Sequence, residues 1–261
     1  MIRPLLAAGA ALILLFASQP VSADVVDVKT RDTTIRVLIE GSEKPSHVVV
    51  LFAGGDGAVG IDDDGAIGDL GGNFVVRTRN MLHDRGMATV VLAAPGDMPS
   101  LLGMRDRDNY ARDVENVMVY LRGRFKETPI WMHGTSRGTI SIVFTLPKFG
   151  AAANRPDGVV LSSAVTRGAK YPHVFQGEPG TITGAVLVLH HKDDPCKVTP
   201  VDGAKRPFKS LTAANPKKLM LMEGGGQNAR GKPCHAFSHH GFIDIEERVI
   251  DAMAGYIKTP N

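Results

Sequence analysis

The sequence is poor in several features that mark large classes of protein. Its formal net charge is only +3, and basic residues do not interleave with aromatic ones, so nothing indicates a nucleic-acid partner. No apolar run is long enough to span a bilayer comfortably, and there is no internal repeat or low-complexity tract. With 43% hydrophobic and 22% charged residues, the chain has the composition of an ordinary globular protein. We expect residues 24–261 to form a single domain.

Cysteine is also scarce, with Cys196 and Cys234 as the only two. In a reducing compartment, two cysteines would be small buried hydrophobic residues. In an oxidising compartment, two is the number that makes one bridge. The choice therefore depends on where the protein resides.

The first 23 residues differ from the rest of the chain and bear on that choice. Arg3 precedes an apolar run from Leu5 to Ala17, and Val21-Ser22-Ala23 supplies the small residues of a cleavage site. This pattern predicts a signal peptide over residues 1–23 and an exported protein, periplasmic or secreted, with a Cys196–Cys234 disulfide. No cysteine follows the apolar run to take a lipid, so no stable membrane insertion is expected after cleavage. An anchored form is the alternative.

Strand-like and helix-like segments alternate along the remaining chain. Two antiparallel edge strands are predicted between residues 24 and 39. The predicted buried strands after them are His47–Phe52, Met87–Ala93, Ile130–Met132, Val159–Leu161, Ala185–Leu189 and Leu219–Met222. The predicted helices are Phe74–Arg85, Tyr110–Phe125, the segment after Ser136 that ends at Pro147, and a closing helix through Ile257 with Asp244 and Glu247 as a capping box. This alternation predicts an α/β fold, a mostly parallel sheet with helices on both faces.

One strand leads into a glycine-flanked serine. The run Ile130–Met132 is followed by Gly134-Thr135-Ser136-Arg137-Gly138, a G-x-S-x-G pentapeptide before a helical segment. A strand, a sharp turn and a helix would place the Ser136 hydroxyl at the carboxyl edge of the sheet. The two glycines would leave room where a Cβ would clash. Ser136 is therefore a candidate nucleophile.

A glycine-rich loop follows an earlier strand and allows a different interpretation. Gly55 to Gly60 match G-x-G-x-x-G, the pattern of a dinucleotide site. That site needs a helix opening at the last glycines, and the segment Ile61–Gly65 breaks any helix. A calcium loop around Asp62 and Asp64 lacks two strong ligand positions. The loop is better explained as a solvated turn.

A serine hydroxyl needs a base, and the base needs a group that orients it. Asp193 and Asp194 follow a strand in HHKDDPC, and His239 and His240 follow the last strand in SHHGF. All four residues are therefore expected on the same sheet edge as Ser136. The residues alone do not choose between the two aspartates or between the two histidines.

With these motifs, the chain resembles the α/β-hydrolase superfamily in the order Ser, acid, His. The resemblance implies a serine hydrolase, acting on carboxylic esters of small molecules through an acyl-enzyme, without a cofactor or metal. It implies Ser136 as nucleophile, Asp194 as acid and His240 as base. A catalytically silent binding protein with the same fold is the alternative, as is a peptidase or thioesterase with the same triad.

The same resemblance implies an oxyanion hole and the absence of a large lid domain. One backbone N–H would come from Arg137 and the other from Gly55 or Asp56. The segment after the Val159–Leu161 strand, residues 166–183, is too short for a large lid. The disulfide would tie the acid loop to the base loop.

Several charged and metal-binding residues have competing interpretations. A zinc site is the rival for the Cys/His-rich segments His190, His191, Cys196, Cys234, His235, His239 and His240. The Arg137 side chain could attract an anionic acyl or leaving group, although an outward or salt-bridged arginine is the simpler expectation. Arg105 is expected to pair with neighbouring aspartates, and Asp113 to be solvated at a helix start.

Overall fold

The computed structural model describes residues 22–168 and 170–261, and most of the predicted signal peptide lies outside them. The strands are β1 Ser22–Lys29, β2 Thr34–Gly41, β3 Val48–Phe52, β4 Ala88–Pro95, β5 Ile130–Thr135, β6 Gly158–Ser162, β7 Gly184–His191 and β8 Ala214–Met222. The α-helices are α1 Phe74–Arg77, α2 Arg79–His83, α3 Asp108–Phe125, α4 Gly138–Thr145, α5 Val201–Ser210 and α6 Glu246–Lys258.

These strands form one 8-stranded sheet in the order β1-β2-β4-β3-β5-β6-β7-β8. The pairs β1–β2 and β2–β4 are antiparallel, and every pair from β4 to β8 is parallel. The predicted α/β class is therefore confirmed, with antiparallel pairing confined to one edge. Because the central strands run parallel, their carboxyl ends all lie at the same end of the sheet, and this row of strand ends is called the carboxyl edge.

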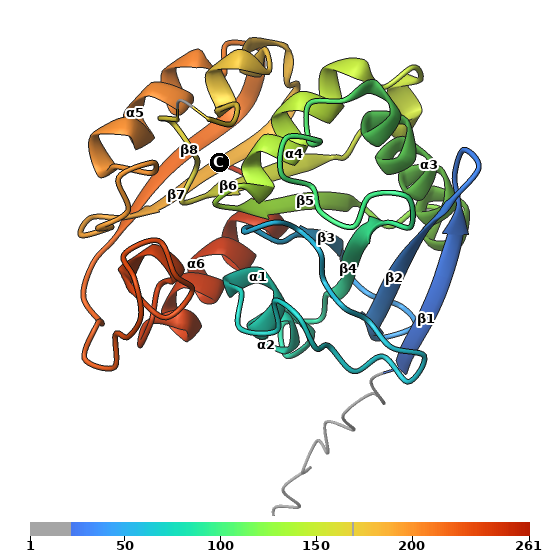
Figure 1. Cartoon of the computed structure of the whole chain (residues 1–261), viewed down its shortest axis with the longest axis horizontal. Helices are drawn as coiled ribbons and strands as arrows, with labels where there is room; N and C mark the ends of the chain where they lie inside the picture. The colour runs from blue at the N-terminus through green and yellow to red at the C-terminus, as the bar shows by residue number, and fades with distance from the viewer. Residues whose placement is uncertain (1–21, 169) are drawn as a thin grey trace, which may run out of the picture.

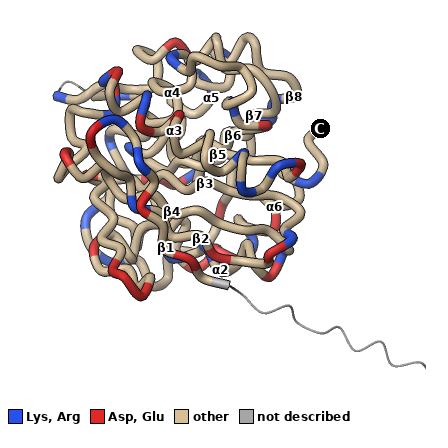
Figure 2. Tube along the Cα trace, turned by 90° about the vertical axis from the view of Figure 1, so that its right-hand side faces the viewer, with Lys and Arg blue, Asp and Glu red and all other residues tan. Residues whose placement is uncertain are grey.

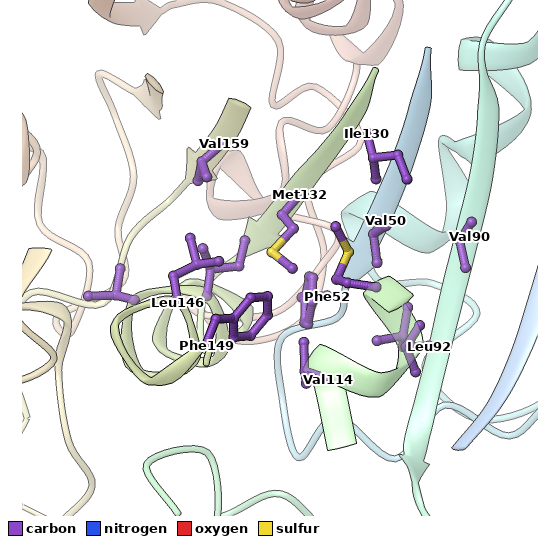
Figure 3. Packing of buried hydrophobic residues seen from close by; sticks show 14 of the residues in the cluster. Val50, Phe52, Val90, Leu92, Val114, Ile130, Met132, Leu146, Phe149 and Val159 are labelled. Carbon is purple, nitrogen blue, oxygen red and sulfur yellow. The ribbon is translucent and has the colours of Figure 1, made fainter. Parts of the chain in front are cut away.

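Helices cover both faces of this sheet, as Figure 1 shows. On one face, apolar side chains of α3 and α4 form one buried cluster with alternate residues of the strands, in which Val114 of α3 lies by Phe52 and Leu92 (Figure 3). On the other face, α1, α2 and α6 supply the apolar partners. The buried central strands read as continuous apolar runs because both of their faces are covered.

The start of β1 overlaps the predicted signal peptide by two residues. Ser22 pairs with Gly41, and Ala23 pairs with Glu40. Cleavage after Ala23 would leave the six pairs from Asp24 to Lys29 in place. None of the helices in the described residues is long and apolar enough to cross a membrane. Acidic and basic residues are interspersed along the chain trace (Figure 2).

Two local predictions are wrong, and one helix was not predicted. The helix expected over Phe74–Arg85 is two short helices, interrupted at Thr78, whose hydroxyl donates to Phe74 O at 2.6 Å. Such a bond from a side chain to the backbone competes with regular helix geometry.

The capping box is absent because Asp244 has φ 67° and its carboxylate accepts from the backbone N–H and side-chain amide of Asn228. Helix α5 was not predicted, since Gly203 and Pro207 lie inside it.

Asp113 also differs from its prediction as a solvated residue. Its side chain is fully buried, and its Oδ2 lies 2.7 Å from Arg31 Nη2. Arg31 also contacts Asp97 at 3.1 Å. The pair connects the turn after β1 to the first turns of α3. The helical pattern could not reveal this, because the partner is 82 positions away in the chain.

Candidate active site

Ser136 lies in a strained turn between β5 and α4. Its φ is 52°, a value that L-residues other than glycine rarely adopt. A Cβ on Gly134 would lie 2.6 Å from Gly138 O, and a Cβ on Gly138 would collide with Phe52 O. Both glycines of the pentapeptide are therefore required by close backbone contacts. The N–H of Ser136 donates to Ser162 O at 3.0 Å, which fixes the turn to β6.

Asp194 and His240 are in direct contact at the same sheet edge. His240 Nδ1 lies 3.0 Å from Asp194 Oδ2, and the Asp194 side chain is fully buried. Asp193 instead uses its backbone N–H to bond His191 Nδ1 at 3.0 Å. Of the two aspartates that the sequence left open, Asp194 is the one that meets the histidine. His240 is also the buried member of the His239–His240 pair.

The environment of Asp194 keeps its carboxylate ionised. Burial acts to raise the pKa of this carboxyl, but hydrogen bonds from His240 and from the Cys196 N–H outweigh burial and hold the pKa below its ordinary value. An ionised carboxylate only accepts hydrogen bonds, so His240 Nδ1 carries the proton in this contact. His240 Nε2 is then free to accept a proton.

Thr199 is a third member of this contact that the sequence analysis missed. Its hydroxyl donates to Asp194 Oδ2 at 2.8 Å and lies 3.1 Å from His240 Nδ1. Its carbonyl lies 2.9 Å from His190 Nε2, and His190 is buried beside Asp194. Burial lowers the pKa of His190, so this ring is neutral. A threonine five positions after the acid has no motif that would mark it.

The loop that carries His240 is held by hydrogen bonds at several points. Ser238 Oγ accepts from the His240 N–H at 3.1 Å, and His240 O accepts from Ser163 Oγ at 2.9 Å. Arg77 donates to Gly241 O at 2.6 Å and pairs with Glu246 at 2.8 Å. The backbone on both sides of the imidazole is therefore fixed.

Ser136 and His240 line one small pocket. Its wall also includes Gly55, Asn73 and Cys234. Among the described residues, Ser136 Oγ makes no hydrogen bond. The candidate nucleophile Ser136 and the candidate base His240 are therefore not hydrogen-bonded to each other in this structure. Such contacts are often long without substrate and shorten in the complex.

Gly55 of the glycine-rich loop lines this pocket. A Cβ on Gly54 would lie 3.0 Å from the Cβ of Ser136, which explains why glycine is needed there. No group in the described chain accepts from the N–H of Gly55 or Asp56, while Asp56 O accepts from Leu101 N at 2.7 Å. Asn73, which the sequence analysis missed, also faces the pocket, and its buried Oδ1 has no partner among the described residues.

Arg105 does not pair with its neighbouring aspartates, contrary to prediction. It is 3% exposed and donates to Ala53 O at 3.1 Å and to Ser141 Oγ. Burial lowers the pKa of Arg105, and the charge of Arg137 adds to this effect. The Arg105 side chain therefore holds the glycine-rich loop by donating hydrogen bonds to its backbone carbonyl groups.

The predicted disulfide is present between Cys196 and Cys234, 38 positions apart. It joins the segment after Asp194 to the segment before His240. Both sulfurs are therefore unavailable as thiolate ligands for zinc. Both ring nitrogens of His191 are also occupied, by Gly224 O at 2.8 Å and by the Asp193 N–H. This arrangement argues against the Cys/His zinc site.

Comparison with known proteins gives a result at the level of fold. No family model matches the sequence, and no curated protein sequence matches it. A cold-adapted esterase from an Arctic intertidal metagenomic library matches in structure with a TM-score of 0.57 and 14% identity, over 91% of this chain and 92% of its own. A serine hydrolase without a lid from Xanthomonas campestris matches with a TM-score of 0.54 and 13% identity, over 94% of each chain. Dienelactone hydrolase from Anabaena variabilis matches with a TM-score of 0.58 and 12% identity, over 91% of this chain and 95% of its own.

This protein has the α/β-hydrolase fold. The expected absence of a large lid domain agrees with the described residues between β6 and β7, which contain only two short 3-10 helices, Val174–Gln176 and Pro179–Thr181. In this α/β-hydrolase fold, Ser136 follows β5, Asp194 follows β7 and His240 follows β8. The fold thus explains why three residues so far apart in the sequence converge.

Proposed function

We propose that this protein is an exported serine hydrolase that cleaves carboxylic esters of small molecules through an acyl-enzyme. The observation that carries the proposal is the 3.0 Å contact between His240 Nδ1 and the buried carboxylate of Asp194. His240 in turn lines the same pocket as Ser136. The disulfide supports a location outside the reducing cytoplasm. The esterase and hydrolase names of proteins with similar structures support the reaction class.

In this mechanism, Ser136 Oγ attacks the ester carbonyl carbon while His240 Nε2 takes the hydroxyl proton. Asp194 holds the imidazole by its Nδ1–H and stabilises the positive charge that the ring gains. His240 then gives the proton to the leaving alkoxide, and the alcohol departs. Water attacks the acyl-enzyme with His240 again as base, which releases the acid and restores Ser136.

The negative charge that develops on the carbonyl oxygen needs donors that are already in place. We assign this role to the N–H of Arg137 and to an N–H of Gly55 or Asp56. The free N–H groups of the glycine-rich loop support this assignment. Because the donors are backbone groups, side-chain substitution at these positions would not remove them.

Kinetics of matched variants test the proposal. Replacing Ser136 or His240 with Ala should each lower kcat on a p-nitrophenyl ester by several orders of magnitude, because triad residues act as a unit. The double variant should be no worse than either single variant. Comparable turnover in Ser136→Ala, with an unchanged melting temperature, would refute the mechanism.

A further inference from the structure

Two cations next to the candidate nucleophile share one aromatic ring. The guanidinium carbon of Arg137 lies 5.2 Å from the centroid of the Tyr171 ring, and Lys170 Nζ lies 5.3 Å from the same centroid. Neither cation forms an ion pair with a carboxylate in the described part of the chain. Of the two arrangements expected for Arg137, outward or salt-bridged, the salt-bridged one is absent from the described residues, and positive charge accumulates one residue from Ser136.

These side chains line two adjoining hollows. The larger one, of about 220 Å³, is lined by Arg137, Ile140, Val165, Arg167, Tyr171 and neighbouring residues. The smaller one shares Arg137, Ile140 and Tyr171 and reaches the buried Arg105. The described lining residues of both hollows include no Asp or Glu. Arg167 is the one lining cation with an acidic partner, Asp202, at 2.8 Å.

Arg105 makes the inner wall positive as well. Only 3% of Arg105 is exposed to solvent. All of its hydrogen bonds go to neutral oxygens of Ala53, Gly55 and Ser141. Its buried Nε has no partner among the described residues. Among the described residues Arg105 makes no ion pair, although the charge of Asp56 acts to raise its pKa. A buried cation without a direct ion pair is costly, and an anion placed nearby would lower that cost.

We propose that the hollow beside Arg137 and Tyr171 binds a carboxylate group carried by the ester substrate. This inference rests on the proposed hydrolase function and names its substrate class, a monoester of a dicarboxylic acid. The planar guanidinium of Arg137 can bind a carboxylate through two parallel N–H bonds. The apolar side chains of Ile140 and Val165 supply a wall for the methylene groups between carboxylate and ester. Arg137 directly follows Ser136 in the chain, so the proposal places the ester carbonyl at Ser136 and the carboxylate at the Arg137 side chain.

The test compares esters that differ only in this charge. Monomethyl succinate, glutarate and adipate are each measured against the corresponding dimethyl ester, with acid release followed by pH-stat. For the best chain length, the wild type should favour the charged ester at least about tenfold in kcat/KM, mainly through KM, as expected for one charge-assisted pair. Arg137→Gln should remove about tenfold of that preference, because it removes the charge and keeps the backbone N–H.

Arg124→Gln is the matched control. Arg124 pairs with Asp24 at 2.5 Å, at the opposite end of the strands, and its loss changes net charge by the same amount. This control should retain the preference for the charged ester. Raising the salt concentration from 0.05 to 0.5 M should weaken the preference in the wild type, since salt screens exposed charges.

A second readout does not depend on ester turnover. Adipate should slow the labelling of Ser136 by a fluorophosphonate in the wild type and in Arg124→Gln, but much less in Arg137→Gln. Equal rates for charged and neutral esters, with no protection by adipate, would overturn the carboxylate site and leave the hydrolase proposal intact. No ester turnover and no labelling of Ser136 would overturn the hydrolase proposal itself, and the carboxylate site with it.

Discussion

At the scale of single residues, the hydroxyl of Thr199 takes part in the Asp194–His240 contact. This hydroxyl donates to the same carboxylate oxygen that His240 contacts. We predict that Thr199→Val lowers kcat about tenfold, the effect of losing one hydrogen bond to a charged group of about 1.5 kcal/mol. Thr199→Ser, which keeps the hydroxyl, should retain near wild-type kcat. Equal kcat in all three proteins would show that the hydroxyl does not position the pair.

His133 gives the protein a specific acid sensitivity. It is buried in β5, its Nε2 lies 2.9 Å from Ser162 Oγ, and burial lowers its pKa from 6.5 to about 3. Between these two pH values the unfolded chain binds a proton that the folded chain does not, so stability falls as the pH falls. From pH 7 to pH 4.5 this single group should cost roughly 2 to 3 kcal/mol.

Urea unfolding of wild type and His133→Gln at both pH values measures this contribution. The loss of stability on acidification should be smaller in the variant by that amount. Because Asp194 and the other titrating groups are the same in both proteins, their contributions cancel in the comparison. An identical loss of unfolding free energy in the two proteins would show that His133 of the folded protein is already protonated at pH 4.5.

Part of this residue-scale picture was accessible from the sequence. Ser136 was identified because its glycines impose a backbone pattern, and Asp194 and His240 because each follows a strand. Thr199 and Asn73 were not found, since a hydroxyl or amide that approaches only in the folded chain leaves no local pattern. The same reason explains Arg105, whose partners are the Ser141 hydroxyl and backbone carbonyls 50 and 52 positions away.

At the scale of elements, the acid loop and the base loop are joined by Cys196–Cys234. We predict that the double variant Cys196→Ser/Cys234→Ser lowers the free energy of unfolding by about 2 to 4 kcal/mol, as expected for a bridge closing a loop of this length. It should also lower kcat, because the loops that carry Asp194 and His240 would move more freely.

Urea unfolding and ester kinetics with and without a reductant measure this contribution. The reductant should destabilise the wild type and have no effect on the double variant, which serves as its control. A wild type whose stability and kcat do not respond to complete reduction would rule out a role for the bridge.

Element prediction succeeded for the strands and was weaker for the helices. Strands β3 to β7 are buried on both faces, so their apolar runs are conspicuous in the sequence. Helices α1 and α2 form a bent pair because Thr78 bonds back to Phe74 O, and α5 carries both Gly203 and Pro207. These helices depend on tertiary packing more than on local preference, which sequence patterns do not report.

At the scale of the whole molecule, the carboxyl ends of β3, β5, β7 and β8 lie at one end of the sheet, so residues as far apart as Gly55 and His240 line one pocket. The alternation of strands and helices made this fold predictable. The distribution of charge within it was not, because the carboxylate partners of surface arginines such as Arg31 and Arg36 lie on other elements. That Arg137 and Arg105 pair with no carboxylate of the described residues therefore becomes apparent only in the folded protein.

The central claim is that Ser136 is an activated nucleophile at this sheet edge. The most direct test is the intact mass of the protein after exposure to a fluorophosphonate, with Ser136→Ala and, as the matched control at an exposed serine, Ser46→Ala. We predict a single adduct in the wild type and in Ser46→Ala, and none in Ser136→Ala. No adduct in the wild type, or an adduct that persists in Ser136→Ala, would contradict the account and favour a binding protein with the α/β-hydrolase fold.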